Sequence, residues 1–190
     1  RETDQLGGSD PYSASKAAAE IISTSWRRSF LQGAGVAVAT ARAGNVVGGG
    51  DWSADRIIPD TARAFSSGET LKIRSPNSVR PWQFVLDPLR GYMMLAQACW
   101  TSPDRFAGAW NFGPHPHAVS TVQTVVKRFA DAWGDGGTWM SEPTGDTKHE
   151  ANILLLDSAK STNALGWHAH YDFDQTINET VAWYRAFYEH

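Results

Sequence analysis

Tyr12 and Lys16 stand four positions apart, and these residue types at this spacing can do chemistry. On a helix both side chains lie on one face, so the lysine ammonium group stabilises the ionised form of the phenol. A free phenol, with a pKa near ~10, is a poor base at neutral pH, but a phenol beside a fixed cation can take a proton from an alcohol while a hydride leaves its carbon. The pair therefore indicates alcohol oxidation, although the pattern alone is also typical of a solvated helix start.

The segments around this pair have the features of an α/β fold. Asp10 and Pro11 form a helix start, and an apolar face then continues to Trp26. Small and β-branched residues at 36–41 predict a strand that is buried on both faces, as in a parallel sheet. In a doubly wound sheet, function lies at the carboxyl ends of the strands, and Asn45 follows this strand.

Seven segments carry a resemblance to a known family: residues 7–8, 10–16, 42–52, 55–59, 73–76, 80–83 and 110–114. Together they resemble the extended short-chain dehydrogenase/reductases, and most of all the sugar-nucleotide 4,6-dehydratases that act on CDP-glucose. The Gly-Gly-Gly-Asp-Trp stretch at 48–52 and Arg-Pro-Trp-Gln at 80–83 distinguish that subfamily from dTDP-glucose dehydratases and 4-epimerases. The resemblance implies a doubly wound, Rossmann-like NAD-binding domain and a smaller α/β domain that binds the nucleotide sugar.

The resemblance also implies a reaction. CDP-glucose becomes CDP-4-keto-6-deoxyglucose by internal hydride transfer through bound NAD, so that the cofactor is restored. Tyr12 would remove the proton of the C4 hydroxyl, and Lys16 would bind the nicotinamide ribose and stabilise the phenolate. Both residues would thus be catalytic and would contact the cofactor. A related dehydratase or a 4-epimerase is the alternative within the same enzyme class.

The resemblance assigns substrate contacts to five further residues. Asn45 would donate a hydrogen bond to the substrate diphosphate, and the alternative is a turn residue. Arg80 suits the diphosphate because a guanidinium group matches phosphate oxygens in a bidentate way. Arg56 is a candidate for a substrate contact and also for a solvated position. Trp52 and Trp82 would shape the cytidine or sugar pocket.

The resemblance divides the chain into two domains. Residues 1–47 would form the C-terminal part of the NAD-binding Rossmann domain, and residues 48–190 mainly the substrate-binding domain, with 85–113 returning to the Rossmann domain. The sequence lacks the strand, Gly-rich turn and helix that cradle a dinucleotide pyrophosphate, and also the Thr-Asp-Lys segment expected to supply the elimination acid. We therefore interpret the chain as the C-terminal portion of a larger enzyme. A non-catalytic remnant that binds nucleotide sugars is the second hypothesis.

Composition and charge narrow the class of protein. A net charge of -3 and a pI near 6.1 argue against nucleic acid as the partner. No apolar run approaches the ~20 residues of a membrane span. The single cysteine, Cys99, cannot form an intramolecular disulfide and fits a reducing cytoplasm. The helix that carries Tyr12 and Lys16 resembles one that pairs across a two-fold axis in this superfamily, which predicts a homodimer for the complete enzyme.

Apolar patterns predict which further elements are buried. The helix that begins at Asp87 is apolar around most of its surface as far as Cys99, so we expect it to be buried. A strand is expected at 153–156. Four tryptophans on predicted helices are expected in the core rather than against a ligand: Trp26, Trp100, Trp133 and Trp183.

The histidines raise a metal hypothesis that their spacing does not support. His115 and His117 form one pair, and His168 and His170 another, but no cysteine or carboxylate stands at familiar zinc spacing from either. His149 lacks the second histidine of a His-Glu-x-x-His motif. We therefore expect surface histidines and no metal site.

Overall fold

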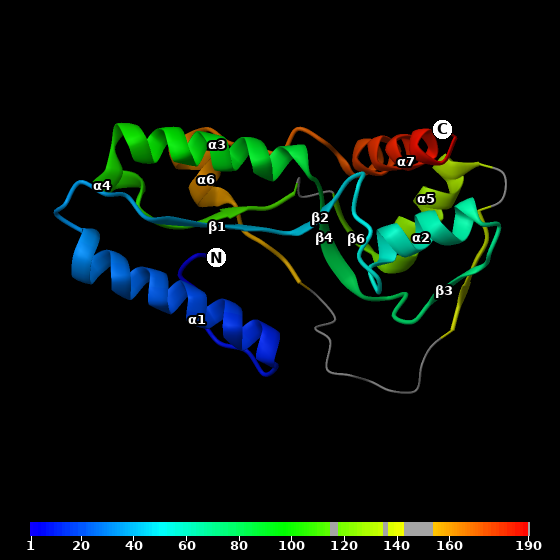
Figure 1. Ribbon diagram of the computed structural model, residues 1–190, viewed down its shortest axis with the longest axis horizontal. Coiled ribbons are helices and arrows are strands. Elements are labelled where there is room, and N and C mark those ends of the chain that lie inside the picture. The colour runs from blue at the N-terminus through cyan, green and yellow to red at the C-terminus, as the bar shows by residue number, and fades with distance from the viewer. Residues whose placement is uncertain (115–117, 135–136, 143–153, 190) are drawn as a thin grey trace. The chain divides into compact units, whose positions relative to one another are not determined.

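The computed structural model describes residues 1–114, 118–134, 137–142 and 154–189, which form two compact units built from interleaved segments of the chain (Figure 1). Unit 1 comprises Arg1–Ala43, Pro88–Gly113 and Leu156–His168. Unit 2 comprises Gly44–Asp87, Pro114–Leu155 and Ala169–His190. Each unit combines parallel strands with helices, so the α/β character predicted from the sequence is present in both.

Unit 1 is organised around a pair of parallel strands. Its elements are α1 (Pro11–Trp26), the π-helical turn η1 (Arg27–Leu31), β1 (Ala39–Ala43), α3 (Leu86–Thr101), α4 (Pro103–Phe106), β5 (Gly108–Phe112) and α6 (Ala159–Leu165). The first two residues of α3 belong to unit 2, because unit 1 resumes at Pro88. β1 and β5 pair in register from Ala39 opposite Gly108 to Ala43 opposite Phe112. Figure 1 shows α1 along one side of this pair and α3 along the other, which is the layering of a doubly wound fold.

The core of unit 1 lies between β5, α3 and the end of α6. The buried ring of Phe112 meets Trp167 edge to face at a centroid distance of 5.1 Å, and Tyr92 on α3 at 5.5 Å. Gly91 brings the backbone of α3 close to these rings, because a Cβ atom at this position would overlap Phe112. A glycine inside the helix therefore serves close packing.

Unit 2 has a three-stranded sheet in the order β2-β4-β6. β2 (Asn45–Val47) runs parallel to β4 (Val79–Phe84), and β6 (Val119–Thr121) runs antiparallel to β4. A second pair joins β3 (Leu71–Ile73) to β7 (Trp139–Ser141). The helices of this unit are α2 (Ile57–Ser66), α5 (Val122–Trp133) and α7 (Phe173–Glu189). Their apolar faces form one core with Val47 and Trp82 of the sheet.

The predicted burial of the helix after Asp87 is wrong. One side of α3 packs on Phe112 and Trp167, but Met93 is exposed and Trp100 is 91% exposed. A two-stranded layer covers only one side of a helix, and the described residues place no other apolar element over the remaining side. The apolar composition of α3 was therefore a poor guide to its burial in this chain.

The structure confirms some of the other predictions about buried tryptophans and element bounds and contradicts others. Trp133 is buried as predicted, whereas Trp26, Trp100 and Trp183 are exposed, so their assignment to the core is wrong. The strand predicted at 153–156 is also wrong for its described part, because residues 154–156 have no strand structure. The first α-helix ends at Trp26 and continues as the π-helical turn η1 to Leu31, and the strand after it begins at Ala39 rather than at 36.

Candidate active site

The first turn of α1 is fixed by a capping residue. The carboxylate of Asp10 accepts hydrogen bonds from the Ser13 backbone N at 3.0 Å and from Ser13 Oγ at 2.6 Å. These bonds, the hydroxyl first, hold the pKa of the Asp10 carboxyl below its usual value. Pro11 takes the first helical position, where its missing N–H costs nothing. The cap thereby sets where the helix begins and places Tyr12 in its first turn.

The structure brings Tyr12 and Lys16 together on one face of α1. Lys16 Nζ lies 5.4 Å from the centroid of the Tyr12 ring, within the range of a cation–π contact. Tyr12 is 71% exposed, so its hydroxyl is open to an incoming molecule. Among the described residues no carboxylate pairs with Lys16. Its ammonium group is therefore free to bind a polar ligand beside the phenol.

Glu20 continues the same face of α1 and joins it to the sheet. Its Oε1 accepts a hydrogen bond from Arg42 Nε at 2.9 Å, and its Oε2 accepts one from Thr40 Oγ1 at 2.8 Å. Tyr12, Lys16 and Glu20 are spaced at four-residue intervals, so the clamp at Glu20 orients the side of the helix that carries the pair. Sequence reasoning missed this residue, although an acid four residues after Lys16 and an arginine at the strand end were visible signals. Arg42 lies near the end of β1, where its ion pair with Glu20 joins the strand to α1.

In unit 2 the sheet gathers three of the predicted substrate residues. Asn45 on β2 lies opposite Trp82 on β4, and Arg80 precedes Trp82 by two positions on the same strand. Alternation along a strand therefore points all three side chains to one side of the sheet. Arg80 is mostly buried and its Nη1 donates to Val79 O at 2.8 Å, whereas Trp82 lies in the core and its Nε1 donates to Ser120 O at 2.9 Å. The packing role of Trp82 is thus visible, and its substrate contact stays a prediction.

The Gly-Gly-Gly-Asp-Trp stretch packs against the aromatic face of α7. A Cβ atom on Gly49 would overlap the indole of Trp183, so glycine is required for this approach. Tyr184 Oη donates to Asp51 O at 2.6 Å, and burial, followed by the Asp51 charge, raises the pKa of Tyr184 to about 12. The Trp52 ring lies 5.4 Å from that of Tyr184, edge to face. The stretch is thus held in place by α7, and Trp52 is half-exposed at the surface of unit 2.

Arg56 lies at the start of α2 and is mostly exposed. Its Nη1 pairs with Asp51 Oδ2 at 3.1 Å. Burial raises the pKa of Asp51, but hydrogen bonds from Ser53 and Arg56 outweigh it, and the pKa is lowered overall. Arg63 on α2 donates to Trp52 O at 3.1 Å. Arg56 and Trp52 therefore belong to one ordered loop at the surface of unit 2, and a substrate contact of either stays a prediction.

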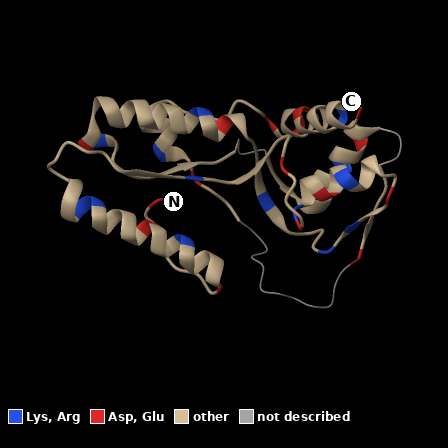
Figure 2. Cartoon of the chain, in the orientation of Figure 1, with Lys and Arg blue, Asp and Glu red and all other residues tan. Residues whose placement is uncertain are grey.

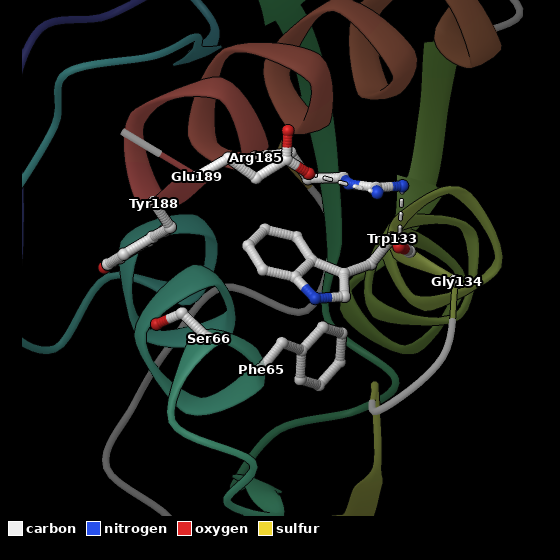
Figure 3. Close-up of a pocket in the computed structure, with 7 residues that line it drawn as sticks. All are labelled: Phe65, Ser66, Trp133, Gly134, Arg185, Tyr188 and Glu189. Atoms are coloured by element: carbon white, nitrogen blue, oxygen red, sulfur yellow. Dashed lines mark hydrogen bonds and ion pairs between the residues drawn. The ribbon is translucent and has the colours of Figure 1, made fainter.

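A hollow of about 520 Å³ opens between α2, α5 and α7 in unit 2 (Figure 3). Its walls are formed by Phe65, Ser66, Trp133, Gly134, Arg185, Tyr188 and Glu189. The Arg185 guanidinium group crosses it, donating to Trp133 O at 3.2 Å and to Glu189 Oε1 at 3.2 Å. None of the predicted site residues lines this hollow, so it is separate from the residues that the family resemblance singles out.

The described part of the chain holds no group of three or more His, Cys, Asp or Glu residues that could bind a metal ion. His115, His117 and His149 lie outside the described residues. No described helix is long and apolar enough to cross a membrane. Figure 2 shows basic and acidic residues interspersed along the helices of both units.

Comparison with protein families gives one match that covers almost the whole chain. The family model described as GDP-mannose 4,6 dehydratase matches residues 1–180. This match confirms the relationship that the motifs predicted.

Two curated relatives come from Salmonella typhimurium. Its CDP-glucose 4,6-dehydratase is 42% identical over 191 residues, which are 98% of this chain and 53% of the relative. Its dTDP-glucose 4,6-dehydratase is 25% identical over 189 residues, covering 97% of this chain and 50% of the relative. The chain spans about half the length of the curated relatives it matches.

Solved structures show the fold. The dTDP-glucose 4,6-dehydratase from Bacillus anthracis, in complex with NAD, matches with a TM-score of 0.77 at 22% identity, over 98% of this chain and 55% of that one. The UDP-glucose-4-epimerase from Stenotrophomonas maltophila, with NAD and formylated UDP-arabinopyranose, matches with a TM-score of 0.81 at 19% identity, over 99% and 58%. The Rossmann-like α/β fold predicted from the sequence is confirmed.

Proposed function

We propose, because this chain belongs to the GDP-mannose 4,6 dehydratase family, that it is part of an NAD-dependent hydro-lyase that converts CDP-glucose to CDP-4-keto-6-deoxyglucose. The choice of substrate is supported by the difference in identity between the CDP-glucose relative, at 42%, and the dTDP-glucose relatives, at 24–27%. The Gly-Gly-Gly-Asp-Trp and Arg-Pro-Trp-Gln stretches also support CDP-glucose as the substrate, because they resemble those of the dehydratases that act on it.

The observation that carries the proposal is the pairing of Tyr12 and Lys16 on a capped helix. In its ionised form, the exposed Tyr12 side chain can take the proton of the C4 hydroxyl of the sugar, as a general base does when it lies within hydrogen-bond reach. The Nζ of Lys16, which has no carboxylate partner among the described residues, lies 5.4 Å from the centre of the Tyr12 ring. The clamp of Glu20 on Thr40 and Arg42 limits rotation of this helix face. Tyr12 would thus accept the proton of the C4 hydroxyl on its phenolic oxygen, while Lys16 and Glu20 hold the tyrosine in position.

The same two side chains fit a nicotinamide cofactor. An exposed phenol and an unpaired ammonium group on one helix face are hydrogen-bonding partners for the hydroxyls of a ribose. When bound, NAD supplies the acceptance and return of the hydride. Tyr12 and Lys16 would hold its nicotinamide ribose.

Unit 2 supplies the candidates for binding the nucleotide sugar. Asn45 and Arg80 share a sheet and a side of it, and an amide together with a guanidinium group suits the oxygens of a diphosphate. Arg56 and Trp52 lie in the loop held by α7, where they can reach a ligand at the surface. Trp82, which lies in the core of unit 2, would shape the cytidine or sugar pocket by packing beneath it.

We also propose a homodimer in the cytoplasm for the complete enzyme. The outer side of α1 and η1 exposes Ile21, Ile22, Trp26 and Phe30, an apolar surface of the kind that a paired helix covers. The single cysteine agrees with a reducing compartment.

The test is to incubate the complete enzyme of which this chain is proposed to be part with CDP-glucose and NAD, and to measure the 4-keto sugar by its ultraviolet absorbance in alkali. Formation of this product supports the dehydratase. Tight binding of CDP-glucose without product would favour the alternative, a nucleotide-sugar-binding portion without turnover. Release of a C4-epimer of the substrate would favour a 4-epimerase. A chain that neither binds nor converts CDP-glucose would contradict the proposal.

A further inference from the structure

The hollow in unit 2 lies where three helices end. Its walls come from the carboxyl-terminal ends of α2, α5 and α7 (Figure 3). The last carbonyl groups of a helix have no partners within the helix and carry partial negative charge. Three such ends around one hollow therefore favour a positively charged group there. The volume of about 520 Å³ is within the range of sites that bind small molecules.

A positively charged side chain already uses this environment. Arg185 donates from Nη1 to the carbonyl oxygen of Trp133, the last residue of α5, and from Nη2 to Oε1 of Glu189, each at 3.2 Å. A guanidinium group has five N–H donors, so these two bonds leave donors available within the described part of the chain. The side chains of Arg185 and Glu189 are 48% and 62% exposed, and so exposed an ion pair is weak. A ligand can therefore share both charges at little cost.

Aromatic rings form the apolar wall of the hollow. The Trp133 ring meets Phe65 at a centroid distance of 6.1 Å and Tyr188 at 6.4 Å, both edge to face. Trp133 is only 9% exposed, yet its Nε1 donates to no group in the part of the chain that the structure describes. An indole N–H can only donate, and a nearly buried donor without an acceptor destabilises the fold. The wall therefore offers a flat apolar surface and one donor that needs an oxygen atom.

We propose that this hollow binds an α-amino acid with an apolar side chain. The ammonium group of the ligand would pair with Glu189 near the helix ends. Its carboxylate would accept hydrogen bonds from the remaining N–H groups of Arg185 and from Trp133 Nε1. Its side chain would pack on Trp133 and Tyr188.

The arrangement of charges favours a ligand that carries both signs. In an α-amino acid the two charged groups are attached to one carbon atom, which suits Arg185 and Glu189 because these side chains are in direct contact. A simple cation would leave the donors of Arg185 and Trp133 without an acceptor, and a simple anion would face three helix carboxyl ends. The inference does not rest on the function proposed above, since none of the residues named for that function lines the hollow.

The experiment measures, by NMR titration, the affinity of the complete protein that contains this chain for three compounds: L-phenylalanine, its methyl ester and its N-acetyl derivative. The ester has the ammonium group without the carboxylate, and the N-acetyl derivative has the reverse. We expect phenylalanine to bind with a Kd of about 1 mM or lower and each derivative about tenfold more weakly, because one charge-assisted contact is lost. Absence of phenylalanine binding up to about 10 mM would overturn the inference, as would equal affinity for either derivative.

Two variants assign the partners of each charge. Arg185→Gln should weaken phenylalanine binding about tenfold and leave the affinity for the methyl ester unchanged, because the ester has no carboxylate. Glu189→Gln should weaken phenylalanine binding to a similar extent and leave the affinity for the N-acetyl derivative unchanged. Arg185→Met, with the same expectation as Arg185→Gln, replaces that variant should it fail to fold.

A matched control separates ligand contacts from structural roles. Arg128→Gln removes a similarly exposed arginine from an ion pair on α5, outside the hollow, and should alter none of the three affinities. An equal loss for all three compounds in the Arg185 and Glu189 variants would contradict the inference, because it would show that these side chains support the fold of the hollow and do not recognise charge.

Discussion

Glu20 and Arg42 form the ion pair that ties the helix of the candidate catalytic pair to the parallel strands of unit 1. Arg42 Nε donates to Glu20 Oε1 at 2.9 Å, and the glutamate side chain is only 15% exposed. A second bond, from Thr40, occupies the other carboxylate oxygen. The pair lies two helical turns from Tyr12, so the sheet and the candidate base are connected through one stretch of α1.

Removal of this carboxylate should weaken the attachment of α1. We expect Glu20→Ala to lower the free energy of unfolding by about 1–3 kcal/mol, because Arg42 and Thr40 lose a partly buried acceptor. Glu20→Gln should lose less, since its amide oxygen can still accept one bond. Urea denaturation measures both. Glu179→Ala, at an exposed position of α7, is the control, and a Glu20→Ala variant as stable as that control would contradict the clamp.

A methyl group on Gly49 should disturb the loop before Trp52. Gly49→Ala would overlap the indole of Trp183, so we expect a loss of about 1–3 kcal/mol, the usual effect of overpacking. Gly7→Ala, where nothing lies within 4 Å of the added Cβ, should leave stability within about 0.5 kcal/mol of the wild type. Thermal melting of both variants, and of Gly49→Ala combined with Trp183→Ala, checks the cause. We expect Gly49→Ala to cost less stability when Trp183 is already alanine than it does in the wild type. An equal cost in both backgrounds would show that the methyl group clashes with another group.

The raised pKa of Tyr184 predicts a loss of stability in alkali. The folded chain holds this phenol protonated up to a pKa of about 12, whereas an unfolded tyrosine ionises near ~10. An acid with a raised pKa contributes its stabilisation below the unfolded value and loses it as pH rises toward the folded value. Wild type should therefore lose stability between these values more steeply than Tyr184→Phe, which cannot ionise there. Melting curves at successive pH values test this, and parallel slopes would contradict it.

Local signals in the sequence predicted the parts of the structure that depend on neighbours along the chain. Asp10 and Pro11 fixed the start of α1, and the four-residue spacing placed Tyr12 and Lys16 on one face. Trp133, expected in the core from its place on a predicted helix, is buried on α5. These features depend on helix geometry alone, which the order of residues specifies.

Features that depend on distant partners were beyond the sequence. The exposure of α3 depends on how many elements cover it, and the strands β6 and β7 are three residues long and pair with segments far along the chain. The contacts of Glu20 with β1 likewise follow from packing between the helix and the strand. Apolar periodicity describes one helix or strand at a time and carries no information on the contacts between elements.

The most direct test of the central claim is the rate of 4-keto sugar formation, with CDP-glucose and NAD, by the complete enzyme that carries Tyr12→Phe. If the Tyr12 hydroxyl is the base, this variant should be at least about 100-fold slower, the usual contribution of a general base, with an unchanged melting temperature because the side chain is exposed. Tyr188→Phe, which removes a hydroxyl from α7, should keep the wild-type rate. A Tyr12→Phe variant with wild-type turnover would contradict the account.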